Sequence, residues 1–409
     1  MEKKLEPSLR FKDFNDVYKN YVLNDVLDLL TDFESNGSFA SVKENVNIYE
    51  EKNYAWYVRA TDLENNSSLD KVKYVDEHSY KFLKKTPLFG DELLITKRGE
   101  IGKVYFFKSE KDVKATVAPN MYLLKLNMLV DSKYVYYSFI NNDGNKKLKR
   151  INASTTIGAL YKDDVKSIKV RFPKIEEQQK IASFLTDVDD RITKLTKKKE
   201  LLEHYKKGVM QKIFNQKLRF KDDEGNEFPE WEVKMLGDVF TFKQGFQFGV
   251  EEQSETYFKG SVEFIRIINV TSDKNDKRYV LDPGKEHHIN KEDLFMVRYG
   301  DAGRVANGFT GIIANNMFRL LPNFDINKLF FFYNLGRLYN KIHSLSGSST
   351  MPAISFSTIN KLKIIVPSLE EQTKIANFLS DIDIKIEVLN TKIENSKTFK
   401  KGLLQQMFV

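Results

Sequence analysis

The sequence predicts an α+β protein built as an internal repeat, in which two α/β variable domains are joined by two long helices. Three observations support this: a segment of 43 residues occurs twice, both copies have an apolar period typical of coiled coils, and short strand-like stretches precede each copy. We therefore expect variable domains at 1–172 and 223–366. The helices at 173–222 and 367–409 should form an antiparallel coiled coil with pseudo-twofold symmetry.

The repeat is clearest in the helical segments. Residues 173–215 align without a gap with residues 367–409, and 20 of the 43 pairs are identical. Upstream, similar landmarks recur in the same order but with drifting spacing, such as Asn120-Met121-Tyr122 and Asn316-Met317-Phe318. The helices have thus been kept after a duplication, whereas the domains before them have diverged.

Both helical segments begin with residues typical of helix starts. Pro173 and Pro367 stand at the entrances, and two glutamates follow in each first turn, where the helix dipole favours carboxylates. Ser368 and Glu371 have the spacing of a capping box, which Lys174 cannot form in the first copy.

The apolar residues of both segments follow a four-three rhythm, which predicts a left-handed coiled-coil seam. Lys199, Lys206, Ser396 and Lys400 interrupt this seam, so it is imperfect and offers surface to another protein. Phe184, Phe214, Phe378 and Phe408 flank it, either as a docking surface or as padding of the coiled coil itself. The seam residues are Ile181, Leu185, Val188, Ile192, Leu195, Leu202, Val209, Ile213, Ile375, Leu379, Ile382, Ile386, Leu389, Ile393, Leu403 and Met407.

The variable domains contain a mixture of predicted strands and helices separated by turn signals. Helices are expected at 134–140 and 329–338. Strands are expected at 93–96, 104–107, 122–126, 264–270, 311–314 and 362–366.

Composition and motifs give no indication of an active site. The chain has no Cys, which excludes disulfides and thiol chemistry, and its five His residues lack the spacing of a zinc motif. The stretch Gly99-Glu100-Ile101-Gly102-Lys103 lacks the spacing of a phosphate-binding P-loop. Because these motifs are missing, we expect no metal or cofactor bound by this chain. We find no signal peptide and no transmembrane run, and therefore expect a cytoplasmic protein.

The charge distribution favours local contact patches over a broad basic surface. The net charge is +8, but residues 173–222 account for +5 of it and residues 367–409 for none, so the variable domains carry only +3. Arginine can pair with guanine, and glutamine or asparagine with adenine. The candidate DNA contacts are Lys97, Arg98, Lys103, Thr155, Thr156, Lys243, Gln244, Gln247, Arg266, Arg298, Tyr299, Arg304, Ser348, Ser349 and Thr350.

The combination of motifs resembles the specificity subunits of type I restriction–modification systems. The shared features are LRFKDF and LRFKDD at the module starts, GDELLITKRGEIG and MVRYGDAGRVANG inside, and PxxEEQxKIAxFL at both helix entrances. The resemblance covers essentially the whole chain. The first module departs from the pattern in having Val17-Tyr18 where the second has Trp231, and LNDV in place of LGDV.

The resemblance implies that each variable domain is a target recognition domain for one half of a bipartite sequence in double-stranded DNA. It implies that the paired helices set the spacer and dock two methyltransferase subunits, while restriction subunits join the complex. S-adenosylmethionine, ATP and magnesium would belong to those partners, and this chain would be a non-catalytic subunit. The alternative is a non-enzymatic scaffold whose two heads bind proteins.

Overall fold

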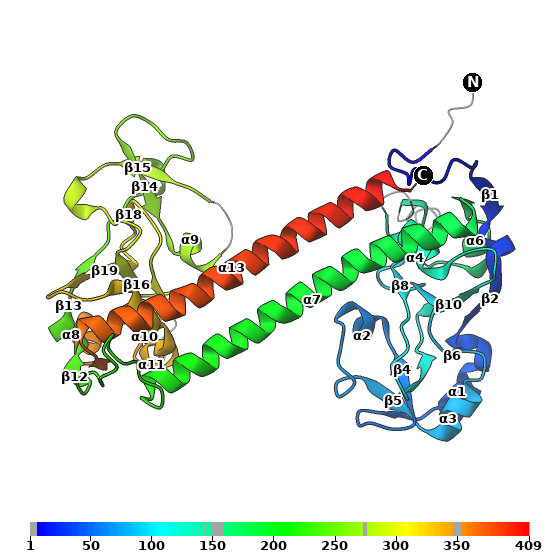
Figure 1. Ribbon diagram of the computed structural model, residues 1–409, viewed down its shortest axis with the longest axis horizontal. Helices are drawn as coiled ribbons and strands as arrows, with labels where there is room; N and C mark the ends of the chain where they lie inside the picture. Colours follow the sequence, from blue (N-terminus) through cyan, green and yellow to red (C-terminus); the bar gives the residue numbers. More distant parts are fainter. Residues whose placement is uncertain are drawn as a thin grey trace. The chain divides into compact units, whose positions relative to one another are not determined.

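The computed structural model describes residues 6–141, 144, 146–148, 159–272, 276–346 and 353–408 (Figure 1). The chain forms two compact units, one of Met1–Lys197 with Asn390–Val409 and one of Lys198–Leu389. Each unit therefore contains one variable domain and part of both long helices, α7 (Ile175–Phe214) and α13 (Leu369–Gln406).

The first unit is built on small sheets covered by short helices. A pair of strands, β1 (Lys19–Val22) and β11 (Lys169–Phe172), closes the domain beside α7. A four-stranded sheet has the order β2 (Leu27–Asp32), β10 (Met121–Leu126), β7 (Leu93–Thr96), β8 (Val104–Phe106). A five-stranded sheet has the order β3 (Ile48–Tyr49), β5 (Lys73–Val75), β4 (Ala55–Val58), β9 (Lys114–Val117), β6 (Pro87–Leu88). The helices are η1 (Leu23–Val26), η2 (Phe33–Asn36), α1 (Phe39–Asn45), α2 (Ala60–Glu64), α3 (Glu77–Phe82), α4 (Ser132–Ile140) and α6 (Lys162–Lys166).

The second unit repeats this plan with fewer strands. The closing pair is β12 (Glu232–Met235) with β20 (Lys363–Val366). The four-stranded sheet is β13 (Phe240–Gln244), β19 (Met317–Pro322), β16 (Leu294–Val297), β17 (Val305–Ala306), and a three-stranded sheet is β15 (Tyr279–Leu281), β14 (Ser261–Ile265), β18 (Ile312–Ile313). The helices are α8 (Leu236–Val239), η3 (Val250–Glu252), α9 (Ile267–Thr271), η4 (Lys285–His287), α10 (Lys328–Arg337), α11 (Tyr339–Ser344) and α12 (Phe356–Asn360).

The expected elements of the variable domains are confirmed with one correction. Both predicted helices and five of the six predicted strands are present within a few residues of the expected positions. The predicted strand at 264–270 is wrong beyond Ile265, because Arg266 starts the short helix α9. Apolar β-branched residues favour a strand there, but Asn269 accepts a hydrogen bond from the Arg266 backbone N–H (2.8 Å) and caps a helix.

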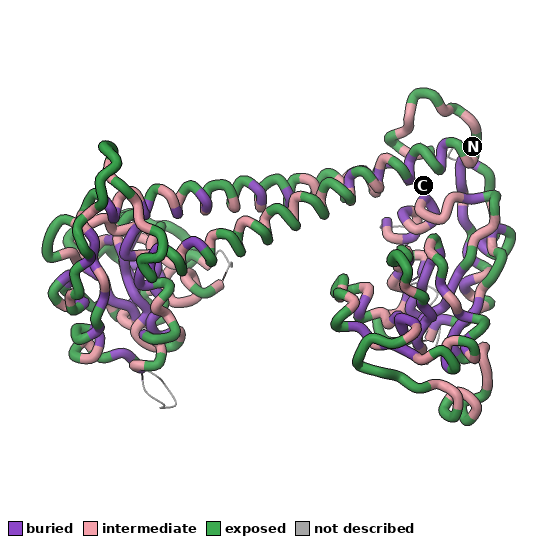
Figure 2. The backbone as a smooth tube through the Cα atoms, turned by 60° about the horizontal axis from the view of Figure 1, so that its bottom comes forward, coloured by how far each residue is buried: buried purple, intermediate pink, exposed green. Residues whose placement is uncertain are grey.

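The coiled-coil seam is confirmed on both helices. Each of the sixteen seam side chains is buried or half-buried, and Figure 2 shows the buried positions recurring along both helices. Within each unit the two helix parts pack on each other and run antiparallel (Figure 1). Asp189 of α7 pairs with Lys400 of α13 in the first unit, and Lys206 of α7 pairs with Asp383 of α13 in the second.

The entrance of α7 is held by a buried carboxylate. Arg10 donates from Nε and Nη2 to the two oxygens of Glu177, both at 2.7 Å. The Tyr18 hydroxyl donates to the same carboxylate at 3.4 Å. The second glutamate of the helix entrance thus binds the arginine of the LRF motif at the start of the chain.

The entrance of α13 repeats the arrangement with Trp231 in the place of Tyr18. Glu371, which has a fully buried side chain, accepts hydrogen bonds from Arg219 (3.2 and 2.9 Å) and from Trp231 Nε1 (2.8 Å). Ser368 Oγ caps the Glu371 backbone N–H at 3.3 Å. The expected capping box is only half formed, because the carboxylate of Glu371 binds Arg219 and Trp231 instead of the Ser368 backbone.

The glutamine after each glutamate ties the helix to its own variable domain. Gln178 Nε2 donates to the Pro173 carbonyl and its Oε1 accepts from the Asp131 backbone N–H, both at 2.9 Å. Gln372 makes the same two contacts with Pro367 and Asn327, again at 2.9 Å. Asp131 and Asn327 are the N-caps of α4 and α10, so both copies of the EEQ motif position an equivalent helix.

Two of the lysines that interrupt the seam form ion pairs within it. Lys206 Nζ donates to Asp383 Oδ1 at 2.5 Å, and the Tyr333 hydroxyl of α10 donates to Asp383 Oδ2 at 2.6 Å. Lys400 and Asp189 form the equivalent pair at 2.6 Å, with the hydroxyl of Tyr137 at 2.8 Å from Asp189. Each of these sites links both long helices to the variable domain of its unit.

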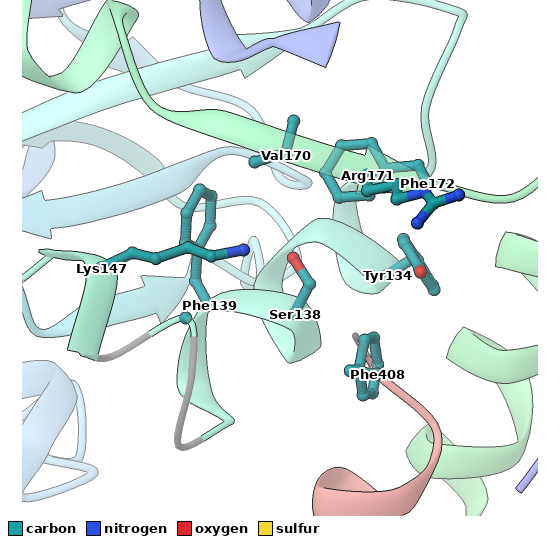
Figure 3. A pocket seen from close by; sticks show the side chains of 9 residues that line it. Tyr134, Ser138, Phe139, Lys147, Val170, Arg171, Phe172 and Phe408 are labelled. Carbon is teal, nitrogen blue, oxygen red and sulfur yellow. The ribbon is translucent and has the colours of Figure 1, made fainter. Parts of the chain in front are cut away.

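Two of the flanking phenylalanines belong to the domain cores. Phe408 packs on Tyr134 with ring centroids 5.2 Å apart, and Figure 3 shows it beside Tyr134 and Phe172. Phe214 packs against the Trp231 ring of the second unit at 6.4 Å. Because both are at least 92% buried, the docking-surface alternative does not hold for these two phenylalanines. The C-terminal ends of both helical segments therefore form part of the hydrophobic cores of the domains.

Candidate nucleic-acid interface

In the second unit, four strands end around one hollow. The segments that follow β13, β14, β16 and β18 supply its walls, so residues far apart in sequence meet there. Three sequence-predicted contacts, Gln247, Arg266 and Tyr299, line this hollow. They are accompanied by Phe246, Phe248, Gln253, Phe264, Ile267, Ala314, Asn315 and Asn316.

Glycines allow the backbone segments to approach each other at this place. A Cβ on Gly245 would lie 2.3 Å from the carbonyl oxygens of Ile313 and Ala314. Gly245 and Phe246 continue beyond β13 through hydrogen bonds to Met317 (3.0 Å) and Ile313 (2.9 Å). The tight turn therefore presents Phe246 and Gln247 at the rim of the hollow.

Asn315 connects three predicted contact residues. Its side-chain amide donates to Gln247 Oε1 at 2.9 Å, and its backbone carbonyl accepts from Gln244 Nε2 at 2.8 Å. The Tyr299 hydroxyl lies 3.4 Å from Asn315 Oδ1. Gln244 and Gln247 are exposed, so this network fixes polar side chains in orientations that a ligand can contact.

Within the described part of the chain, two buried polar atoms beside the hollow lack hydrogen-bond partners. Arg266 Nη2 binds Asp276 through its carbonyl (3.0 Å) and carboxylate (2.9 Å), but Arg266 Nε has no partner there. Asn316 Oδ1 is also without one. Unsatisfied buried groups are rare because each costs about 1–3 kcal/mol. One donor and one acceptor are thus placed beside the same hollow.

The remaining basic candidates of this unit are mostly engaged. Arg298 donates from Nε to the Ile354 carbonyl at 3.3 Å, and its guanidinium lies 5.4 Å from the centre of the Phe356 ring. Arg304 binds Asp301. Lys243 is exposed and makes no ion pair with any described residue.

The equivalent place in the first unit is filled by an ion cluster. Lys97, whose side chain is only 5% exposed, binds Asp32 (2.8 Å) and Glu34. Lys162 binds the other oxygen of Asp32 at 3.0 Å, and Ser35 donates to it as well. Burial alone would raise the pKa of Asp32, but the hydrogen bonds from Lys97, Ser35 and Lys162 outweigh it and hold the pKa well below its ordinary value. The Lys97 ammonium therefore neutralises internal carboxylates.

The other candidates of the first unit lie at the surface. Arg98 is 65% exposed, with Nη1 3.9 Å from Glu34. Lys103 pairs with Glu64 and Glu100. The remaining candidates lie outside the described residues: Thr155 and Thr156 of the first unit, and Ser348, Ser349 and Thr350 of the second.

Sequence reasoning missed Asn315, which lines the hollow, and did not align Arg59 with Arg266. Asn315 lies in the sequence ANN (314–316), directly after a strand. A pair of polar residues at a strand end is a signal that could have pointed to Asn315 as a contact residue. Arg59 lies in YVRATD (57–62), which matches FIRIIN (264–269) around Arg266. The drifting spacing between the modules obscured this match.

Within the described ranges, no helix is long and apolar enough to cross a membrane. The same ranges contain no group of three or more His, Asp or Glu residues arranged to hold a metal ion.

Comparison with known proteins identifies the family. The model of the type I restriction modification DNA specificity domain matches residues 15–204 and again 229–396. A type I restriction enzyme specificity subunit of Methanocaldococcus jannaschii is 28% identical over 339 residues, which cover 77% of each chain.

Solved structures share the fold. The S subunit of a type I restriction–modification system from M. genitalium has 17% identity and a TM-score of 0.63, covering 99% of both chains. A chain from a study of complex assembly and conformational transition of the type I system has 14% identity and a TM-score of 0.55, covering 96% of this chain and 97% of that one. With the family model matched twice along most of its length, this chain belongs to the type I restriction modification DNA specificity family.

Proposed function

We propose that the chain is the DNA-reading subunit of a type I restriction–modification complex and that each variable domain binds one half of a bipartite duplex target. The chain itself contributes no catalysis. S-adenosylmethionine, ATP and magnesium are bound by the methyltransferase and restriction subunits of the complex, which works in the cytoplasm.

The observation that carries this proposal is a shared framework that holds different side chains at equivalent positions. Asp32 pairs with Tyr122 in the first sheet as Gln244 pairs with Phe318 in the second, so Asp32 and Gln244 occupy equivalent positions. One is the centre of a buried ion cluster and the other an exposed amide beside an aromatic hollow. Two readers of different half-sites require this kind of difference, since base identity is read by individual side chains.

The test is methylation mapping with variants of the hollow. A host carrying this chain and its methyltransferase is sequenced for modified bases, first with the natural chain and then with Gln247→Ala and Asn315→Ala. We expect the half-site read by the second domain to become relaxed or lost while the other half-site persists. Mapping that finds no bipartite motif with the natural chain contradicts the proposal.

The paired helices set the spacer between the half-sites in this proposal. The continuous helix α7 has 40 residues and a length of about 60 Å. Deleting four residues from one helix should change the number of unspecified base pairs and leave both half-sites as they are. A changed half-site with an unchanged spacer argues against this role of the helices.

The helices also dock the methyltransferase subunits. Their exposed apolar side chains support this: Leu201 and Tyr205 of α7, and Ile384 and Val388 of α13, are 46–61% exposed within the second unit. In the first unit, Phe399 occupies the repeat position of Tyr205 and is 56% exposed. Equivalent aromatic positions on the two copies suit two identical partners.

Charge insertion tests the docking. Tyr205→Glu and Phe399→Glu should each reduce the number of bound methyltransferase subunits from two to one, measured by the mass of the reconstituted complex. Lys207→Glu, an exposed change on the same helix, is the control. If the two heads instead bind proteins, as in the competing scaffold function, a gel-shift assay with bipartite DNA should show no salt-dependent binding even when the methyltransferase is present.

A further inference from the structure

Arg59 and Arg266 occupy the same place in the two variable domains. Arg59 follows β4, which pairs in parallel with β9, and Arg266 follows β14, which pairs in parallel with β18. The strand carbonyl before each arginine accepts a hydrogen bond at 2.9 Å from the residue after the parallel neighbour, Ala118 or Ala314. The match is thus one of topology and hydrogen bonding as well as of sequence.

The backbone of both arginines is capped in the same way. Asp62 accepts the Arg59 backbone N–H at 3.1 Å, and Asn269 accepts the Arg266 backbone N–H at 2.8 Å. The arginine contributes only its main-chain N–H to this cap, and any residue except proline could supply that group. The turn therefore does not explain why both positions carry a guanidinium.

The partners of the two guanidiniums differ. Arg59 binds Asp62 through Nε (3.0 Å) and Nη2 (2.6 Å), whereas Arg266 binds Asp276, ten residues further along the chain. Each side chain remains partly exposed, 33% for Arg59 and 23% for Arg266. The acidic partner has moved while the arginine has stayed, so pairing with one particular carboxylate is also not the reason.

Neighbouring positions have diverged between the domains. Lys97 and Arg298 are equivalent, since their backbone N–H groups donate to the Asn120 and Asn316 carbonyls at 2.8 Å in both cases. The residues that follow, Arg98 and Tyr299, differ in charge and shape. A partly exposed cation that is kept in two readers of different sequences can contact the same DNA group in both only if the sequences share that group, and all duplexes share the phosphodiester backbone.

We infer that Arg59 and Arg266 are equivalent phosphate anchors, one in each domain, that bind the DNA backbone and orient each domain over its half-site. The inference rests on the proposed function. Asp62 binds Nε and Nη2 of Arg59, and Asp276 binds Nη2 of Arg266. In both arginines Nη1 has no partner among the described residues and can donate to a phosphate oxygen. Base discrimination then comes from the residues that differ between the domains.

The test measures binding by the chain in complex with its methyltransferase subunits. Arg266→Gln is the main variant, because Asp276 is 31% exposed and tolerates losing its partner. Asp62 is only 2% exposed, so Arg59→Gln is paired with Arg59→Lys, which keeps the charge, and the unfolding temperature of each is recorded. Lys81→Gln, which removes an exposed cation that is also paired with a carboxylate, is the matched control.

Affinity is measured over a range of salt concentrations for the mapped bipartite duplex and for a scrambled duplex of the same length. We expect each arginine variant to weaken binding about tenfold on both duplexes, to lower the slope of log affinity against log salt by about one, and to leave the methylated motif unchanged. Arg59→Lys should recover part of the loss.

A loss confined to the mapped duplex, or a changed base in the methylated motif, identifies a base contact and overturns the inference. Unchanged affinity in both variants overturns it too. If the natural complex binds both duplexes equally, the proposed function fails, but the loss on the scrambled duplex still reports whether the arginines contact phosphates.

Discussion

Replacing Asp383 should destabilise the second unit more than replacing either of its partners. Asp383 receives the ammonium of Lys206 from the other helix and the hydroxyl of Tyr333 from α10. Tyr333 is 4% exposed, and burial, followed by the neighbouring carboxylate, raises the pKa of its phenol far above the usual value. The hydroxyl therefore remains a proton donor and depends on Asp383.

The magnitudes follow from exposure. Asp383→Ala leaves the buried hydroxyl without its acceptor, which costs about 1–3 kcal/mol, and removes an ion pair that is 20% and 41% exposed and so contributes at most about 1 kcal/mol. The expected loss is therefore about 1–4 kcal/mol. Tyr333→Phe should cost about 1–2 kcal/mol, because water can still reach the carboxylate, and Lys206→Met less than about 1 kcal/mol.

Denaturant unfolding, followed by far-ultraviolet circular dichroism, measures these free energies in single variants and in the Tyr333→Phe, Asp383→Ala double variant. Because the two residues share a hydrogen bond, their effects should be non-additive by at least about 0.5 kcal/mol. Asp189→Ala provides the repeat measurement in the first unit. Additive effects, or an Asp383→Ala loss below about 1 kcal/mol, would refute the reasoning.

Three further variants test the domains. Glu371→Ala should lower the free energy of unfolding by about 3–5 kcal/mol, because it leaves the Arg219 guanidinium and the Trp231 N–H without their acceptor. Glu371→Gln should lower it less in the same unfolding assay. The depressed pKa of Asp32 means that its ion cluster stabilises the fold above the ordinary value of 3.8 and that this stability is lost as the pH falls. The stability difference between the natural chain and Asp32→Asn should therefore be large at neutral pH and shrink as the pH falls below 3.8, as followed by thermal unfolding. Gly245→Ala forces a Cβ against two carbonyl oxygens and should cost about 1–3 kcal/mol, with loss of the second half-site in methylation mapping.

The architecture could be predicted because its signals are local and occur twice. A four-three apolar rhythm is visible without any knowledge of tertiary contacts, and an ungapped repeat provides an internal comparison. The expected strand at 264–270 failed for the opposite reason. Its apolar residues favour a strand, but one capping hydrogen bond, which the Arg266 backbone N–H donates to Asn269 Oδ1, ends the strand after Ile265.

The contact residues were harder to predict because charge in a sequence does not show where its counter-charge lies. Lys97 and Arg98 are adjacent and both carry a positive charge, yet the first is buried between two carboxylates and the second is exposed. Asp32 is 65 residues from Lys97, so this pairing needs the sheet that brings β2 and β7 together. Asn315, in contrast, carries no charge and belongs to no predicted patch, although it orients Gln244 and Gln247.

The lysines that interrupt the seam change how the repeat should be understood. At sequence level Lys206 and Lys400 weaken a coiled coil and suggest a face for another protein. In the structure each binds an aspartate of the other helix, and Asp383 and Asp189 in turn bind a tyrosine of the adjoining domain. An apolar residue at either position would make no bond to the aspartate. Duplication has therefore preserved a joint between helix pair and domain, and variation of the domain surface leaves that joint intact.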